Sequence, residues 1–167
     1  MKKPGPAKTN AARLLERAGI RYELLEYEVD AGDMSAPQVA QAIGLPPEQV
    51  FKTLVVRGDR TSVLLAVIPG NAELDLKALA AASGNKKVEL VSVKDILGLT
   101  GYVRGGVSPL GAKRVYPVYL DSTAANWPMI SVSAGIKGRQ LLLAPEDLRR
   151  AVEAVLRPIS RPPAYCT

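Results

Sequence analysis

Val50-Phe51-Lys52-Thr53-Leu54-Val55-Val56 is the most informative run in the chain, because it sets one lysine among branched apolar residues. Pro46-Pro47 and Gly58-Asp59 bound the run, and this pattern is typical of a buried β-strand. A lysine in such a strand costs desolvation free energy unless its charge meets a partner. Lys52 therefore has two interpretations: it reaches water from an alternating strand, or it is a cation held in a binding site.

Short helices and strands alternate along the chain. The expected helices have Asn10, Ser35, Asp75 and Ser92 as N-terminal caps, and a last helix covers residues 145–156. The expected strands cover residues 22–29, 50–56, 62–68, 88–91, 115–121, 129–133 and 140–143. Residues 57–60 predict a hairpin. Because strands outnumber helices and several are hairpin-linked, the pattern predicts an α+β domain with a mixed, curved β-sheet flanked by short helices.

The composition predicts the domain organisation. The chain has 167 residues, of which 47% are hydrophobic and 23% charged, and this favours one folded domain. We expect a flexible basic N-terminus at 1–10, a folded domain at 11–157 and a Pro-rich tail at 158–167. No apolar run could span a bilayer, and no apolar segment follows the basic N-terminus as in a secretory signal. We therefore expect a cytoplasmic protein that does not enter a membrane.

Histidine is absent from the chain, and the one cysteine, Cys166, lies in the Pro-rich tail. These facts exclude Ser-His-Asp triads, Cys-His dyads and histidine-ligated zinc. No nucleotide-binding fingerprint is present either, and we expect neither a metal nor a cofactor. Catalysis in this chain would have to use lysine, hydroxyl groups, carboxylates, backbone amides or groups of the substrate itself.

One long loop, residues 101–111, has the sequence Gly-Tyr-Val-Arg-Gly-Gly-Val-Ser-Pro-Leu-Gly. Glycine lets a backbone approach a ligand closely and expose its N–H groups, and Pro109 would fix the exit of the turn. The loop is therefore either a ligand-binding element or only a wide connection between Val103 and Val115.

A second glycine-bearing turn covers residues 131–139 and contains the cations Lys137 and Arg139. Its hydroxyls, glycines and cations suit a phosphate or a ribose, and the net charge of +6 favours phosphate-bearing partners. The same turn is equally consistent with an ordinary hairpin loop. Tyr27 is likewise either a ligand contact or a half-buried strand aromatic.

In their order along the chain, these segments resemble the YbaK/EbsC-type aminoacyl-tRNA deacylases, freestanding relatives of the editing domain inserted in bacterial prolyl-tRNA synthetases. The resemblance covers residues 11–156 and rests on the joint order of Phe51-Lys52-Thr53-Leu54, Gly101-Tyr102, Gly105 to Pro109, residues 132–138 and residues 143–148. The chain is most similar to the Cys-tRNA(Pro) deacylase branch, through Tyr27-Glu28 and residues 105–111. Ala134 departs from that branch, which has a second glycine before Gly135.

The resemblance implies an editing-domain fold whose sheet forms a partial barrel, and a trans-editing hydrolase that deacylates mischarged tRNA. It points to Cys-tRNA(Pro) as the substrate and to substrate-assisted ester cleavage. The catalytic residues that it implies are Lys52, Gly105, Gly106, Ser108 and Pro109. The substrate-binding residues that it implies are Tyr27, Thr53, Ser133, Gly135 and Lys137.

The implied partners are the acceptor end of aminoacyl-tRNA and a synthetase such as prolyl-tRNA synthetase. Three alternatives stay open: a different amino acid preference, as for Ala-tRNA(Pro); a tRNA- or nucleotide-binding module without catalysis; and a small-molecule-binding protein unrelated to RNA. A deacylation assay separates the first two, and the salt dependence of binding tests the third.

Overall fold

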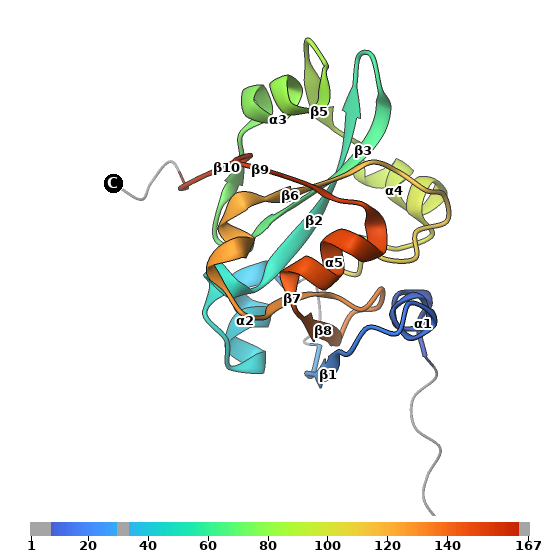
Figure 1. Ribbon diagram of the computed structural model, residues 1–167, viewed down its shortest axis with the longest axis vertical. Coiled ribbons are helices and arrows are strands. Elements are labelled where there is room, and N and C mark those ends of the chain that lie inside the picture. The colour runs from blue at the N-terminus through green and yellow to red at the C-terminus, as the bar shows by residue number, and fades with distance from the viewer. Residues whose placement is uncertain (1–7, 30–33, 164–167) are drawn as a thin grey trace, which may run out of the picture.

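The apolar stretch at residues 50–56 forms the central strand of the structure, as its sequence predicts. The computed structural model describes residues 8–29 and 34–163, and it places most of this stretch in β2 (Phe51–Gly58). β2 pairs antiparallel with β3 (Ser62–Pro69) over its whole length, and the predicted hairpin at residues 57–60 is thereby confirmed (Figure 1).

The remaining elements are short and alternate along the chain. The helices are α1 (Asn10–Arg17), α2 (Ala36–Ile43), α3 (Leu76–Ser83), α4 (Val93–Thr100) and α5 (Pro145–Val152), with 3₁₀ turns η1 (Pro47–Gln49) and η2 (Ser122–Asn126). The other strands are β1 (Glu23–Glu26), β4 (Glu73–Leu74), β5 (Val88–Leu90), β6 (Val118–Asp121), β7 (Ile130–Ser133), β8 (Arg139–Leu143), β9 (Val155–Arg157) and β10 (Ser160–Arg161). None of the described helices has the length and apolar character needed to cross a membrane.

The strands of the described residues form three hydrogen-bonded sheets. A mixed five-stranded sheet has the order β5-β2-β3-β6-β9, a three-stranded sheet has the order β1-β8-β7, and β10 pairs with β4. The predicted α+β class and the mixed sheet are confirmed. The expected partial barrel is not found, because none of these sheets is closed or strongly curled. Closure needs continuous pairing around the barrel, whereas the two larger sheets meet only at a bridge between Val50 and Ser131.

Apolar side chains cover both faces of β2, since successive residues of a strand point to opposite sides. Val55 belongs to the larger core, which also holds α1, α5 and residues of the 101–111 loop. Val56 belongs to a second core, which β3 forms with α3. A third, small cluster of Val39, Ala40 and Val50 fixes α2 beside the start of β2.

Local signals place two of the four predicted N-terminal helix caps correctly. The capping box of Ser35 and Gln38 is confirmed, and Asp75 caps α3 as expected. Thr9 rather than Asn10 caps α1, through its hydroxyl oxygen, and Ser92 makes no side-chain cap at α4.

The last helix ends earlier than expected. α5 stops at Val152, Glu153 adopts a left-handed conformation, and Val155 and Leu156 form β9 instead. β9 pairs in parallel with β6, so these two apolar residues complete the sheet rather than a helix face.

Residues 158–163 of the expected Pro-rich tail pack against the domain. Ile159 is completely buried, and the Asp121 carboxylate accepts hydrogen bonds from the backbone N–H groups of Ile159 (2.8 Å) and Ser160 (3.0 Å). Cys166 and the basic residues of 1–7 lie outside the described residues.

Candidate functional site

A cavity of about 550 Å³ opens along one edge of β2, between the two larger sheets. Its walls come from β2, from α2 and the residues before it, from the end of β5 and the start of α4, and from the 101–111 loop. Ser133 of β7 and Gln140 of β8 complete the lining. Segments far apart in the sequence therefore meet at this one position.

The cavity exists because β2 lacks a neighbour on this edge over a few residues. On one side, Val50 forms the bridge to Ser131; on the other, the Val91 N–H donates to the Val55 carbonyl and β5 pairs from Val56 onward. Backbone groups two residues apart in a strand point to the same edge. The N–H and carbonyl of Thr53 therefore point, like the carbonyl of Val55, toward the unpaired edge.

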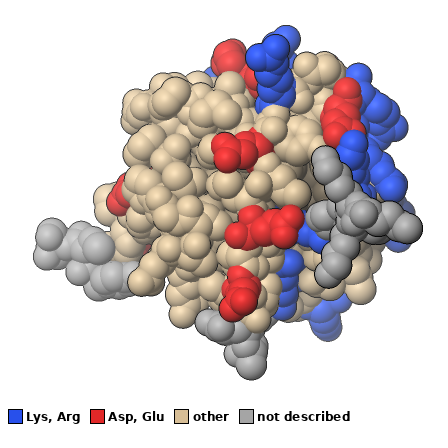
Figure 2. Space-filling view, turned by 90° about the horizontal axis from the view of Figure 1, so that it is seen from below, with Lys and Arg blue, Asp and Glu red and all other residues tan. Residues whose placement is uncertain are grey.

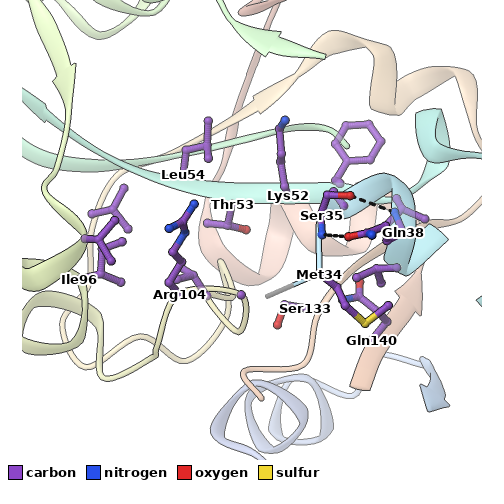
Figure 3. A pocket seen from close by; sticks show the side chains of 18 of the residues that line it. Met34, Ser35, Gln38, Lys52, Thr53, Leu54, Ile96, Arg104, Ser133 and Gln140 are labelled. Atoms are coloured by element: carbon purple, nitrogen blue, oxygen red, sulfur yellow. Dashed lines mark hydrogen bonds between the residues drawn. The ribbon is translucent and has the colours of Figure 1, made fainter. Parts of the chain in front are cut away.

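Thr53 also brings a polar side chain to this position. Its Oγ1 is buried and has no hydrogen-bond partner among the described residues. A buried hydroxyl without a partner is costly, and a ligand group in the cavity could satisfy it. Figure 3 shows Thr53 on the same side of β2 as Ser133 and Arg104.

Lys52 lines the cavity from the opposite side of β2, where Figure 3 shows it pointing away from Thr53. Its Nζ donates a hydrogen bond to the Gly70 carbonyl at 3.2 Å. Burial lowers the pKa of Lys52 below its usual 10.5, and the nearby Glu73 charge opposes that effect. The Lys52 ammonium is therefore half-buried and has one protein acceptor, the Gly70 carbonyl. This position is compatible with both interpretations, a lysine that reaches water and a cation in a binding site.

The two glycine-bearing segments pack against each other. A Cβ added to Gly105 would lie 3.0 Å from Lys137 Cε, and one added to Gly106 would lie 3.4 Å from the backbone of Ile136 and Lys137. Gly105 has a φ of 87°, lines the cavity, and its N–H makes no hydrogen bond to a described residue. The Gly106 N–H, in contrast, donates to the Val103 carbonyl at 2.9 Å. Of the two adjacent glycines, Gly105 is therefore the one that brings an unbonded amide to the cavity.

Tyr102 joins the loop to the second turn. Its hydroxyl donates to the Leu110 carbonyl at 2.7 Å, across the loop. A Cβ on Gly135 would lie only 2.7 Å from Tyr102 Cε1, so a glycine is needed where the ring packs. Burial raises the pKa of Tyr102 to about 12. This tyrosine fixes the shape of the loop that presents Gly105.

Ser108 and Pro109 lie behind the cavity wall rather than in it. Both are buried, and Ser108 Oγ accepts a hydrogen bond from the Leu110 N–H at 3.2 Å. The Gly105-to-Pro109 segment thus presents Gly105 and Val107 to the cavity and turns its last two residues toward the core.

Of the other site residues predicted from the sequence, Thr53 and Ser133 line the cavity and Tyr27, Gly135 and Lys137 do not. Tyr27 packs against the small cluster that forms the α2 wall, and its N–H donates to the Gly138 carbonyl. Ser133 Oγ accepts from the Gly135 N–H at 3.1 Å. Lys137 lies against Gly105, at the edge of the site.

Arg104 is a cavity-lining residue that the sequence patterns did not indicate. It is exposed, and it makes no hydrogen bond or ion pair with the described residues. Figure 3 shows it reaching from the loop toward β2, between Ile96 and Thr53. Its position directly before Gly105 is the only signal in the sequence.

Charge is spread unevenly around this site. Residues 34–47, which include α2, contain no charged residue. Figure 2 shows a broad uncharged surface on the side where α2 lies, and Lys and Arg gather along the opposite edge. In the described part of the chain, no group of three or more His, Cys, Asp or Glu residues is arranged to hold a metal ion.

Comparison with known proteins gives a consistent picture. Residues 31–151 match the family model of the aminoacyl-tRNA editing domain, and this range includes the whole cavity wall, from α2 to β8. The chain is 48% identical, over 88% of its length and 90% of the relative's, to EbsC of Enterococcus faecalis, which is named as a candidate Cys-tRNA(Pro)/Cys-tRNA(Cys) deacylase. It is also 30% identical over 70% of its length to 20% of a proline–tRNA ligase of Shouchella clausii.

A crystal structure described as a candidate trans-editing enzyme for prolyl tRNA synthetase has a similar fold. The two chains superpose with a TM-score of 0.79 and 25% sequence identity, over 93% of this chain and 99% of the other. The similarity therefore extends over nearly the whole of both chains.

Proposed function

The chain belongs to the aminoacyl-tRNA editing domain family and is an aminoacyl-tRNA deacylase, a hydrolase, and we propose that its main substrate is Cys-tRNA(Pro). The observation that carries the proposal is the 48% identity to EbsC over nearly the whole of both chains. Similarity to a segment of proline–tRNA ligases supports tRNA(Pro) as the tRNA.

The reaction that we propose is hydrolysis of the ester between cysteine and the terminal ribose. A nucleophile attacks the carbonyl carbon, the bond to the ribose oxygen breaks, and the ribose leaves as its hydroxyl. The nucleophile is water, or the substrate's own thiol followed by water, since the chain has no histidine to activate a residue of its own.

We assign stabilisation of the developing oxyanion to the N–H of Gly105. The amide is unpaired and lies at the cavity wall, as an oxyanion donor requires. Gly106, whose amide is used within the loop, then serves as a packing residue against the second turn. Ser108 and Pro109 hold the loop from behind.

Lys52 and Thr53 bind different parts of the substrate in this proposal. The half-buried ammonium of Lys52 binds a phosphate of the acceptor strand, on its own side of β2. Thr53 Oγ1 and the Thr53 carbonyl accept hydrogen bonds from the substrate's α-ammonium, which satisfies the buried hydroxyl. Ser133 and the apolar wall around it contact the cysteine side chain, while Tyr27, Gly135 and Lys137 shape the surrounding wall.

Tests of the substrate use a deacylation panel: tRNA(Pro) charged with Cys, Ala, Pro or Ser, and tRNA(Cys) charged with Cys. We expect the fastest release of cysteine from tRNA(Pro). Faster release of alanine than of cysteine from tRNA(Pro) would show that Ala-tRNA(Pro), not Cys-tRNA(Pro), is the main substrate. Binding of every charged tRNA without release of any amino acid would identify a module without catalysis.

We also propose that prolyl-tRNA synthetase assists tRNA selection, in the cytoplasm where tRNA is charged. The cavity has room for the charged terminus of the acceptor end, and the ester chemistry needs no contact with the rest of the tRNA. In this proposal, the synthetase therefore supplies the recognition of the tRNA body. If the proposal is right, adding the synthetase increases the preference for Cys-tRNA(Pro) over Cys-tRNA(Cys). An unchanged ratio of the two rates would contradict it.

A further inference from the structure

We propose that the corner of the cavity formed by Arg104, Val93 and Ile96 binds the terminal nucleotide of the tRNA. The phosphate lies on Arg104 and the base lies on the two apolar side chains. This inference rests on the proposed function, because it places the nucleotide that carries the ester. It gives the loop a binding role separate from that of Gly105.

The first observation is the state of Arg104. Its guanidinium projects beside the unpaired edge of β2, and no described residue pairs with it (Figure 3). An arginine offers several N–H donors in a planar fork that matches phosphate oxygens. Lys52 is engaged with Gly70 on the other side of β2. Of the two described cations that line the cavity, Arg104 is therefore the one available to an anion on the loop side.

The second observation is an apolar wall on the loop side of the cavity, contributed by Val93 and Ile96, which lie one turn apart on α4. Val93 is 54% exposed, although it lines the cavity. Exposed aliphatic side chains that continue a cavity wall mark a surface that a ligand covers. Figure 3 shows Ile96 on the same side of β2 as Arg104.

A nucleotide matches this combination better than a purely apolar or a purely anionic ligand does. Its base has two apolar faces and its phosphate is a single compact anion, so the two halves need the two kinds of surface that adjoin here. The corner also continues into the part of the cavity lined by Thr53 and Gly105. A nucleotide bound in the corner would therefore direct its ribose ester toward the proposed oxyanion donor.

Arg104→Gln tests the phosphate contact. The probe is a tRNA acceptor minihelix that carries cysteine through a stable 3′-amide, and the control is Arg60→Gln in the turn between β2 and β3. We expect Arg104→Gln to weaken binding about tenfold and to lower the magnitude of the slope of log K against log salt by about 0.7–0.9, the share of one phosphate. Arg60→Gln should change neither quantity. An unchanged slope in Arg104→Gln would overturn the phosphate contact.

Val93→Ala tests the base contact, with Val115→Ala as its control, because Val115 is fully exposed and does not line the cavity. Binding is measured for the same minihelix and for one whose terminal nucleotide lacks its base. We expect Val93→Ala to weaken binding of the intact minihelix about three- to tenfold and to leave binding of the abasic one unchanged. Equal losses for both minihelices would overturn the base contact.

The two proposals fail in different assays. Wild-type turnover of Cys-tRNA(Pro) tests the proposed function, while minihelix binding by the variants tests the corner. Normal wild-type turnover with Arg104→Gln indistinguishable from Arg60→Gln would reject the subsite alone. Absent turnover with binding that depends on Arg104 would reject the function and support the subsite.

Discussion

At the scale of single residues, Lys52 combines a proposed role in binding with a cost to the fold. Its ammonium is half-buried and has one protein acceptor, the Gly70 carbonyl. Because burial lowers its pKa, the unfolded chain holds the proton more tightly than the folded protein does. Protonated Lys52 thus lowers the free energy of unfolding at neutral pH, and this cost disappears as the pH rises toward 10.5.

Lys52→Met should therefore separate activity from stability. We expect turnover of Cys-tRNA(Pro) to fall by about 10²-fold or more, comparable to the loss of one transition-state donor. The melting temperature at pH 7 should be unchanged or higher by up to about 4 °C, the shift that about 1 kcal/mol produces in a domain of this size. Single-turnover deacylation and thermal unfolding measure the two effects. Retained turnover would remove Lys52 from the site, and loss of folding would make it structural.

The raised pKa of Tyr102 leads us to expect that the free energy of unfolding depends on pH in the alkaline range. Burial raises its pKa to about 12, so between pH 10 and 12 the folded protein holds a proton that the unfolded chain releases. Its contribution to the free energy of unfolding is complete below pH 10 and is lost as the pH rises toward 12.

Tyr102→Phe should unfold more easily at pH 7, by about 1 kcal/mol, because the Leu110 carbonyl loses its donor. The difference from wild type should shrink as the pH rises above 10, since only the wild-type chain has this group to ionise. Urea unfolding at several pH values measures both. If the difference in the free energy of unfolding between the two proteins stays constant up to pH 11, burial does not raise the pKa of Tyr102.

At the scale of elements, the 101–111 loop has to hold one amide in a left-handed glycine conformation at the cavity wall. Gly105 and Gly19 both have positive φ, of 87° and 70°, but only Gly105 lines the cavity. An alanine at either position carries the same kind of backbone strain, roughly 1–2 kcal/mol. The pair therefore separates loss of stability from loss of function.

We expect Gly105→Ala to reduce turnover by about 10²-fold, because a displaced loop no longer aligns its oxyanion donor. Gly19→Ala should lower the melting temperature by a similar amount and leave turnover near that of wild type. The comparison needs rates and melting temperatures of the two purified variants. Equal effects on turnover would support the simpler interpretation of the loop as a wide connection.

Local sequence signals predicted several element ends that depend on nearby residues, although Thr9 rather than Asn10 caps α1 and Ser92 makes no side-chain cap. The Ser35–Gln38 capping box, the Asp75 cap and the β2–β3 hairpin are all as predicted. They failed where a distant partner decides: Val155 and Leu156 have helical spacing, but the free edge of β6 pairs with them as β9. Spacing alone cannot reveal such an edge, because β6 is more than thirty residues away in the chain.

At the scale of the whole molecule, the uneven distribution of charge bears on how much tRNA the protein contacts. The uncharged α2 side adjoins the cavity, and Lys and Arg gather elsewhere (Figure 2). A protein that holds only the acceptor end should neutralise about two to four phosphates, each adding roughly −0.7 to −0.9 to the slope of log K against log salt.

The expected total slope for wild-type binding is therefore shallow, about −1.5 to −3.5. Titrations of the cysteinyl-amide minihelix and of full-length tRNA across a salt series measure it, and the two should give similar slopes. A much steeper slope for full-length tRNA would reveal wide contacts with the tRNA body. Binding without any salt dependence would exclude RNA as the ligand.

The α+β class, the central strand with its lysine, the two glycine-bearing segments and the family resemblance all follow from the sequence alone. Each of these depends on residue types and on short spacings, such as the branched apolar run around Lys52 and the glycines of 101–111. The absence of histidine limits the available chemistry in the same way, because it is a property of composition and holds for any fold.

How these parts face one another depends instead on the tertiary fold. The fold places Lys52 and Thr53 on opposite sides of β2, leaves Gly105 rather than Gly106 with the free amide, and brings Arg104 into the cavity. The physical reason is that the cavity is a gap in strand pairing, created by where β7 and β5 stop bonding to β2. Such a gap depends on contacts between distant segments, and no local pattern of residues encodes it.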